Sequence, residues 1–277
     1  RSKAGLKSDN TLWVWGSNWE GTLGQNNRTY YSSPVQIPGT TWKSVTGDGN
    51  LAMFATKTDG TLWSWGVKTE GRLGLNSVVQ YSSPIQIPGT NWDTACSMGP
   101  MRGAATRTDG TLWVWGYGAY GLLGQNNTTQ YSSPVQIPGT TWNYTSGNNS
   151  IAALKTDGTL WTWGLNNVGD LGLNDTTKRS SPTQIPGTTW KEIASTTYGH
   201  AATKTDGTLW AWGYNYRGEM GINNRTPYSS PKQIPGTTWN ELSGIGNYAY
   251  AATKTDGTLW VWGNNEYGVL DNNLAHD

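Results

Sequence analysis

The sequence predicts an all-β protein, a β-propeller of four-stranded antiparallel blades with about 50 residues per blade. The first observation is a repeat, because the segment TDGTLWVWG at residues 108–116 returns almost letter for letter five more times. The second is its spacing, since successive copies of its aspartate lie 48 to 50 residues apart. The third is a strand that is apolar on both faces, as expected of a blade covered by two neighbours. Six blade positions are visible in this way.

The repeated segment has the chemistry of a β-hairpin. Asp109 and Gly110 lie between two short runs, and Gly110 can adopt the positive φ of a tight turn. Residues 112–115 (LWVW) then alternate with a period of two, which is typical of a strand. The repeated aspartates are therefore interpreted as turn residues and not as catalytic carboxylates. They are Asp9, Asp59, Asp109, Asp157, Asp206 and Asp256.

One complete unit can be read from residue 42 to residue 91. Its strands are WKSVTGD, LAMFATK, TLWSWG and a run of three residues bracketed by Pro84 and Pro88. Because proline cannot donate to a sheet ladder, this last run is expected to be the outermost strand. The segment IPGTTW then leads to the next inner strand. Its closing tryptophan is either a packing plug between blades or a platform for a ligand, and its repetition favours packing. The copies are Trp42, Trp92, Trp142, Trp190 and Trp239.

The unbroken period predicts a single propeller domain over residues 1–277, or the covered part of a six- or seven-bladed one. The hairpin occurs six times, whereas IPGTTW occurs five times. We therefore expect the first blade to lack its inner strand and the last blade to lack its outer strand. Such incomplete blades expose strand edges, which makes them candidate contacts for assembly neighbours.

Composition and charge argue against several classes of function. The net charge is +1, with 19 basic and 18 acidic residues and no basic stripe, so no nucleic-acid partner is expected. The longest apolar runs are a few residues, so no membrane insertion is expected. Cys96 has no partner for a disulfide and should be buried. His200 and His276 are the only histidines, and we expect no metal and no cofactor.

The segments after each hairpin carry a resemblance to a known family. They read WGSNWEGTLG, WGVKTEGRLG, WGYGAYGLLG, WGLNNVGDLG, WGYNYRGEMG and WGNNEYGVLD. This pattern resembles the repeat of the regulator-of-chromosome-condensation family, in a bacterial or phage-like tandem version. The resemblance implies a propeller fold and a binding surface, and it implies no particular reaction. A histidine that the family often has in the second strand is replaced here, at Ala52, Arg102, Ser150, Gly199 and Ala249.

The loops between strands differ in how much they vary among the copies. The second-to-third turn and the crossover to the next blade emerge on one rim, and they read TDGT and IPGTTW almost without change. The first-to-second and third-to-fourth loops emerge on the opposite rim, and they diverge, as in SMGPM against TTYGH. We call these the constant rim and the variable rim. Because loops that contact a partner diverge more than loops that only close a blade, the variable rim is the predicted binding surface.

The variable loops supply twelve candidate contact residues of aromatic, amide or charged type. The outer loops contribute Trp19, Tyr120, Asn167, Tyr216, Arg217 and Tyr267. The inner loops contribute Asp48, Arg102, Asn149, Tyr198, His200 and Tyr248, which should border the axial opening on that rim.

These observations together predict a non-enzymatic binding or adhesion scaffold that recognises a protein or a glycan. Its low charge and its content of Asn, Thr, Ser and Gly favour display outside a cell or on a virus particle. One alternative is a structural building block, joined to neighbours through exposed blade edges. A less favoured alternative is a glycan-cleaving enzyme, which would need two carboxylates about 5–10 Å apart. The variable rim offers Glu20, Glu70, Asp170, Glu219 and Glu266 for that role.

Overall fold

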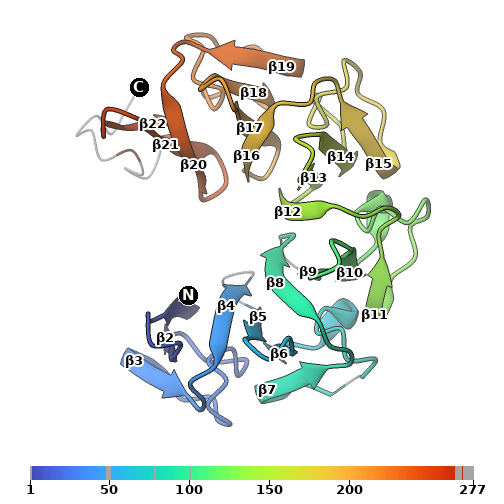
Figure 1. The fold of residues 1–277 in the computed structure, drawn as a ribbon, viewed down its shortest axis with the longest axis vertical. Helices are drawn as coiled ribbons and strands as arrows, with labels where there is room; N and C mark the ends of the chain where they lie inside the picture. Colours follow the sequence, from blue (N-terminus) through green and yellow to red (C-terminus); the bar gives the residue numbers. More distant parts are fainter. Residues whose placement is uncertain (1, 48–50, 78, 100, 266–269, 271–277) are drawn as a thin grey trace. The chain divides into compact units, whose positions relative to one another are not determined.

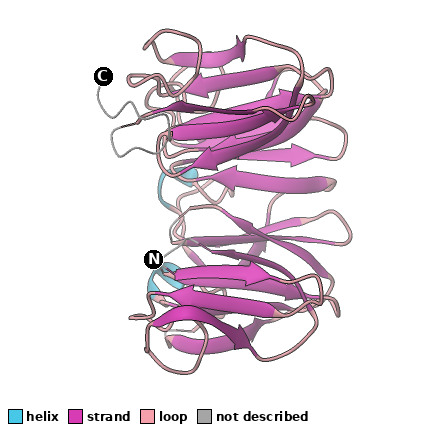
Figure 2. Ribbon diagram, turned by 90° about the vertical axis from the view of Figure 1, so that its left-hand side faces the viewer, coloured by secondary structure: helices cyan, strands magenta, loops and turns pink. Residues whose placement is uncertain are grey.

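The computed structural model describes residues 2–47, 51–77, 79–99, 101–265 and 270. Strands dominate it, and the described helical structure consists of two 3-10 turns, Thr69–Gly71 and Ala119–Gly121 (Figures 1 and 2). The strands form six antiparallel sheets. Sheet 1 holds β1 (Ser2–Leu6), β2 (Leu12–Gly16) and β3 (Tyr31–Ile37). Sheet 2 holds β4 (Trp42–Gly47), β5 (Ala52–Lys57), β6 (Leu62–Gly66) and β7 (Tyr81–Ile87).

The remaining sheets repeat this plan. Sheet 3 holds β8 (Trp92–Ser97), β9 (Arg102–Arg107), β10 (Leu112–Gly116) and β11 (Tyr131–Gln136). Sheet 4 holds β12 (Trp142–Gly147), β13 (Ser150–Lys155), β14 (Leu160–Gly164) and β15 (Arg179–Ile185). Sheet 5 holds β16 (Trp190–Ser195), β17 (Gly199–Lys204), β18 (Leu209–Gly213) and β19 (Tyr228–Ile234). Sheet 6 holds β20 (Trp239–Ile245), β21 (Ala249–Lys254) and β22 (Leu259–Gly263).

Strand order in each sheet follows the sequence, so every blade is a meander of neighbouring antiparallel strands. The predicted four-stranded unit is confirmed in sheets 2 to 5. Sheets 1 and 6 have three strands each among the described residues, as expected for the first and last blades. The outermost strand is also confirmed, but its predicted length is wrong. It spans Tyr81–Ile87 and contains Pro84, which an edge strand tolerates because its outward N–H groups need no partner.

The chain packs as two compact units. Unit 1 comprises residues 1–119 and 128–142, and it contains sheets 1, 2 and 3. Unit 2 comprises residues 120–127 and 143–277, and it contains sheets 5 and 6 and almost all of sheet 4. The extent of a single propeller domain over the whole chain stays a prediction.

The Asp-Gly turns confirm the structural interpretation of the repeated aspartates. Asp109 Oδ1 accepts hydrogen bonds from the backbone N (3.0 Å) and from Oγ1 (2.6 Å) of Thr111. The same Thr111 Oγ1 accepts a bond from Trp113 Nε1 at 2.9 Å. These bonds from threonine hold the pKa of Asp109 below its ordinary value. The carboxylate–threonine–indole chain recurs at Asp9, Asp59, Asp157, Asp206 and Asp256.

A second tryptophan of each LWxWG strand joins neighbouring sheets. Trp65 is fully buried and donates from Nε1 to the carbonyl oxygen of Thr22 in the preceding repeat, at 3.0 Å. Trp115 donates to Arg72 O, Trp163 to Leu122 O, Trp212 to Asp170 O and Trp262 to Glu219 O, at 2.8 to 3.1 Å. The glycine of GxLG allows this approach, since a Cβ at Gly172 would lie 2.9 Å from the Trp212 ring. Five of these strands are thus each bonded to a backbone carbonyl of the preceding repeat.

The tryptophan of IPGTTW is a packing residue, as the sequence analysis favoured. Trp42 is buried and meets Trp63 and Trp65 edge-on, with ring centroids 6.3 and 6.4 Å apart. Trp92 and Trp239 make equivalent contacts in their own sheets. Cys96 is also buried, as expected.

Sheet 6 exposes an apolar face that the equivalent sheets cover. Leu259, Trp260 and Val261 in β22 are 68%, 50% and 37% exposed. In β18 the equivalent leucine and alanine, Leu209 and Ala211, are buried by a neighbouring sheet. No described helix is both long enough and apolar enough to cross a lipid bilayer.

Candidate functional site

Four tyrosines gather in unit 2, where the variable loops of sheets 5 and 6 meet. Tyr198 comes from the loop between β16 and β17, Tyr214 and Tyr216 follow β18, and Tyr248 precedes β21. Tyr198 stacks on Tyr248 with ring centroids 6.3 Å apart and lies 5.9 Å from Tyr214. Tyr214 lies 5.8 Å from Tyr248 and meets Tyr216 edge-on at 5.0 Å. We call these four residues the tyrosine cluster.

Backbone hydrogen bonds hold the loops that carry the cluster. Tyr214 N donates to Tyr198 O at 2.9 Å, which ties the outer loop of sheet 5 to its inner loop. Thr197 N donates to Asn247 O at 3.0 Å, which ties the inner loops of sheets 5 and 6 together. The cluster is therefore a composite of three loops whose backbones are directly bonded.

A buried asparagine shapes the outer loop. Asn215 lies between Tyr214 and Tyr216 and is fully buried. Its Oδ1 accepts from Met220 N at 2.9 Å, and its Nδ2 donates to the carbonyl oxygens of Asn224 and Thr226 at 3.0 Å each. Asn18 and Asn166 make the same bonds in their own repeats. The same asparagine hydrogen bonds therefore fix the loop backbone in these repeats. The side chains on either side of the asparagine can vary while the loop geometry is kept.

Charge at the cluster comes from Arg217 and Glu219. Arg217 is exposed, and its backbone N donates to Glu219 Oε2 at 2.9 Å. Glu219 is buried, and burial raises its pKa above the ordinary value. Burial also raises the pKa of Tyr248, an effect that the positive charge of Arg217 partly offsets. The surface thus combines phenol rings, one exposed guanidinium and a carboxylate held beneath it.

Buried residues next to the cluster in sequence make hydrogen bonds and ring contacts inside sheets 5 and 6. His200 is buried and takes part in hydrogen bonds through both ring nitrogens, with Ser195 Oγ (2.6 Å) at Nδ1 and Ser150 Oγ (2.8 Å) at Nε2. Burial lowers the pKa of His200 to about 3. Tyr250, one repeat later, stacks on Trp262 at 5.9 Å, and its hydroxyl lies 3.2 Å from Thr196 Oγ1. These residues support the loops from inside.

The structure separates the twelve predicted contact residues into groups. Trp19, Tyr120, Asn167, Tyr216 and Arg217 are exposed, and Asn149, Tyr198 and Tyr248 are partly exposed. Three of them, Tyr198, Tyr216 and Tyr248, belong to the tyrosine cluster, with Arg217 beside it. Trp19 lies in unit 1, and no ring contact joins Tyr120 to the cluster. Asp48 and Tyr267 lie outside the described residues.

Two of the predicted contact residues need correction. Arg102 and His200 are buried, so their side chains do not offer a surface to a partner. Both lie in the first two positions of a second strand, where every residue but the last is buried. Arg102 Nε donates to Met98 O at 2.9 Å, and burial lowers its pKa to about 10. The sequence analysis placed them in loops because it set the strand start too late.

The sequence analysis also missed Tyr214. The fifth repeat carries tyrosine in both of its variable loops, TTYGH and YNYRG, and this local enrichment was the available signal. Tyr214 was passed over because it directly follows the strand that ends at Gly213.

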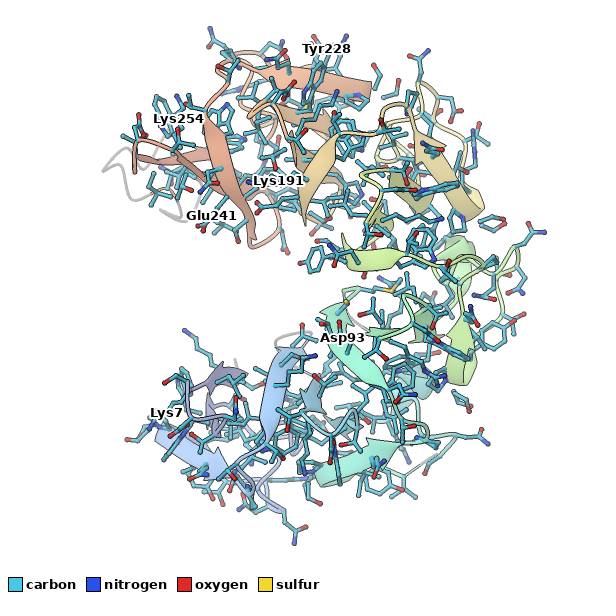
Figure 3. All side chains as sticks on the ribbon, viewed as in Figure 1. Lys7, Asp93, Lys191, Tyr228, Glu241 and Lys254 are labelled. Carbon is cyan, nitrogen blue, oxygen red and sulfur yellow. The ribbon has the colours of Figure 1, made fainter. Side chains whose placement is uncertain are left out.

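A cavity of about 720 Å³ lies on the inner strands of unit 2, away from the cluster residues. Its polar lining includes Lys191, Glu192 and Glu241, two of which are labelled in Figure 3. Glu192 Oε2 accepts from Leu242 N at 3.1 Å, a bond between neighbouring inner strands. Of the rim carboxylates considered for catalysis, Asp170 and Glu219 are buried and Glu266 lies outside the described residues. Within the described chain, no group of three or more His, Cys, Asp or Glu side chains could hold a metal ion.

Comparison with known proteins identifies the repeat. The family model of the regulator of chromosome condensation (RCC1) repeat matches residues 59–99, 109–149, 157–203 and 206–243. These four stretches make up more than half of the chain. The chain belongs to the RCC1 repeat family. No curated protein matches the sequence.

Solved structures show the RCC1-type propeller fold. The crystal structure of human WBSCR16 is 20% identical, with a TM-score of 0.83 over 97% of this chain and 75% of that one. Yeast RCC1 (Prp20) bound to Kap60 is 19% identical, with a TM-score of 0.83 over 100% of this chain and 71% of that one. Prp20p from Saccharomyces cerevisiae, whose binding to Gsp1p and histones is described with its structure, is 19% identical, with a TM-score of 0.81 over 96% and 70% of the two chains. The predicted all-β propeller is thereby confirmed.

Proposed function

We propose that this chain is a non-enzymatic binding scaffold that recognises a protein through the variable rim of sheets 5 and 6. The observation that carries the proposal is the tyrosine cluster beside Arg217. Tyrosine and arginine are the residue types that dominate the energetics of protein interfaces, because they bury large areas and also form hydrogen bonds. The three loops are already bonded to one another, so a partner would meet a preorganised surface.

A protein partner is favoured over a glycan by two considerations. The solved RCC1-type relatives include Prp20, whose structures concern Kap60, Gsp1p and histones. The cluster rings also pack against one another and remain partly or fully exposed, which gives a mixed apolar and polar surface suited to a peptide chain. Display outside a cell or on a virus particle is the setting we propose for this scaffold, from its low charge.

Replacing Tyr216 and Arg217 together by alanine is expected to weaken partner binding by more than about 1 kcal/mol, roughly fivefold. The melting temperature should hardly change, because both side chains are exposed. The fluorescently labelled chain is applied to a protein array and a glycan array, and the affinity of the strongest binder is then measured for each variant.

Two controls accompany this experiment. Tyr30→Ala removes a tyrosine of similar exposure in unit 1, and it should change neither binding nor stability. Gly207→Ala alters the constant rim, where φ is +78° and a Cβ would lie 2.1 Å from Thr237 O, so it should lower stability and leave affinity intact. Equal loss of affinity in Tyr30→Ala, or a binder found only on the glycan array, would refute the proposal.

A second candidate function is a building block of a larger assembly. The exposed side chains of Leu259 and Val261, which share one face of β22, favour it, since the equivalent Leu209 and Ala211 are buried. Exposed apolar faces of this kind commonly mark association sites.

The double variant Leu259→Glu/Val261→Glu is expected to abolish self-association of the chain, because two charges would have to be buried at the contact. The molar mass is measured by light scattering from micromolar to near-millimolar concentration. Val79→Glu, at an exposed valine of unit 1, is the matched control and should leave the mass unchanged. A wild-type chain that stays monomeric throughout this range would rule out association through β22.

A further inference from the structure

Cavities lie at equivalent positions of the repeat, lined in part by residues of the constant-rim segment IPGTTW. In unit 1, a cavity of about 300 Å³ is lined by Trp42, Lys57 and Trp63 together with Pro38, Pro84 and Asn26. In unit 2, a cavity of about 390 Å³ is lined by the equivalent residues Trp190, Lys204 and Trp210 with Pro186, Pro231 and Asn174. We call these the rim cavities. Each is large enough for a single ring-sized group.

A lysine ammonium lies over two indole rings in each rim cavity. Lys57 Nζ is 4.7 Å from the ring centroid of Trp42 and 4.4 Å from that of Trp63. Lys204 Nζ is 4.6 Å from Trp190 and 4.5 Å from Trp210. Cation–π contacts fix the position of the ammonium and leave its N–H donors on the cavity side for other acceptors.

Among the described residues no carboxylate forms a direct ion pair with these lysines, although, after the hydrogen bonds from threonine, the charges of Lys57 and Lys204 help to lower the pKa of Asp59 and Asp206. The ion pairs found there are Lys43–Asp93 and Arg179–Asp175, and neither involves a rim cavity. Asp59, two residues beyond Lys57, directs Oδ1 to Thr61 instead. An anionic group entering the cavity would therefore meet a positioned ammonium that no carboxylate contacts directly.

Asparagine and serine residues that line the cavities add hydrogen-bonding groups to the lysine ammonium. Asn26 and Asn174 are exposed and held in the left-handed region, with φ of 55° and 63°. Each backbone N is fixed by the next sheet, at 2.7 Å from Ser82 O and 2.6 Å from Ser229 O. Ser83 and Ser230 also line the cavities. The cavities thus pair indole edges and proline with an ammonium, an amide and a hydroxyl.

We propose that the rim cavities bind an acidic sugar, such as a hexuronate residue of a polysaccharide. The carboxylate would sit on the lysine ammonium, the ring CH groups on proline and on the partly exposed indoles of Trp63 and Trp210, and the ring hydroxyls on asparagine and serine. This site is separate from the tyrosine cluster and does not depend on a protein partner there. It also gives the constancy of this rim a functional reason.

Repetition makes the sites multivalent. The same stacking recurs for Arg107 over Trp92 and Trp113, and for Lys254 over Trp239 and Trp260. Within one unit, a single weak site is then reinforced when one polymer occupies neighbouring repeats, because later binding events become intramolecular. The ligand class that fits is therefore a chain of acidic sugars.

The test titrates the whole protein with an oligogalacturonate and, separately, with its fully methyl-esterified form, and follows tryptophan fluorescence. The free acid is expected to bind, and the ester at least about tenfold more weakly, since the ester removes the charge and keeps the ring. Binding should also weaken as salt is raised. Equal binding of both forms, or of tetraglutamate in place of the sugar, would overturn the proposal, as would no binding at about 10 mM ligand.

Variants locate the site. Lys57→Gln/Lys204→Gln should lower the affinity for the oligomer at least about fivefold, and Lys57→Arg/Lys204→Arg should retain it, because arginine occupies this position in sheet 3. Lys7→Gln is the matched control. Lys7 (Figure 3) holds the same place in the repeat and stacks on Trp13 at 4.3 Å, but it lines neither rim cavity. If Lys7→Gln loses as much affinity as the double variant, the rim cavities are not the site.

Discussion

Replacing Trp212 by alanine is expected to destabilise the protein by about 3–5 kcal/mol, a large share of the stability of a typical domain. Trp212 is buried, meets Trp190 edge-on at 6.1 Å, and lies 5.8 Å from His200. Its Nε1 donates to Asp170 O at 3.1 Å, so the substitution leaves a cavity and also removes the hydrogen bond between sheets 4 and 5. The cost therefore combines lost packing with an unsatisfied carbonyl oxygen.

Urea unfolding measures this cost. Trp212→Phe keeps most of the ring volume and removes the donor, so its loss of stability should fall between the wild type and the alanine variant. Trp19→Ala, at a tryptophan that is 57% exposed, should change stability by less than about 0.5 kcal/mol. A Trp212→Ala protein as stable as Trp19→Ala would contradict the view that buried indoles join the sheets.

Substituting His200 and substituting Asp170 are expected to change the slope of the unfolding free energy against pH in opposite directions. Burial lowers the pKa of His200 from 6.5 to about 3, so the folded state favours the neutral ring. The stability that the neutral His200 ring contributes to the folded state is fully present above pH 6.5. It falls by about 1.4 kcal/mol per pH unit as the pH drops toward 3.

Asp170 behaves in the opposite sense. Burial raises its pKa from 3.8 to about 6, because Asp170 Oδ1 has no hydrogen-bond partner and the carboxylate is shielded from water. The folded state favours the protonated acid, so its contribution is present below pH 3.8 and is lost as the pH rises through 6. Between pH 4 and 6 the two contributions therefore oppose each other in the wild type.

The variants His200→Gln and Asp170→Asn separate these contributions. Relative to wild type, His200→Gln should lose stability as the pH rises from 4 to 6, and Asp170→Asn should gain it. Glutamine can replace both hydrogen bonds of the ring, and asparagine can still accept from Val168 N, so both proteins should fold. Unfolding free energies from urea titrations at several pH values give the slopes. Parallel curves for the three proteins would show that neither buried group titrates as described.

The sequence was sufficient to predict the fold because the turn residues, the strand alternation and the repeat period all indicate the same four-stranded blade. The Asp-Gly turns, the LWxW alternation and the proline at the edge strand each specify local geometry that the sheets then use. Strand ends were less predictable. Arg102 and His200 were placed in loops because glycine and polar residues flank them, whereas pairing with β10 and β18 extends the strands through them.

The site was predictable in part. Divergence of loops located the rim, and Tyr198, Tyr216 and Tyr248 were found in this way. Which of the six repeats would supply a cluster depends on contacts between loops of different sheets, such as Thr197 with Asn247, and these have no local signature. The rim cavities were missed for the same reason, since their walls come from two sheets, with Asn26 and Pro38 from the loops of sheet 1 and Trp63 and Pro84 from sheet 2.

Hydrogen–deuterium exchange on the complex with the strongest protein-array binder tests the central claim most directly. If the variable rim of sheets 5 and 6 is the binding surface, the partner should slow exchange at residues 196–199, 214–218 and 245–248, which form the loops of the tyrosine cluster. Exchange at residues 205–208 and 235–238 on the constant rim should be unchanged. Protection confined to these constant-rim segments, with none at the cluster loops, would contradict the proposed binding surface.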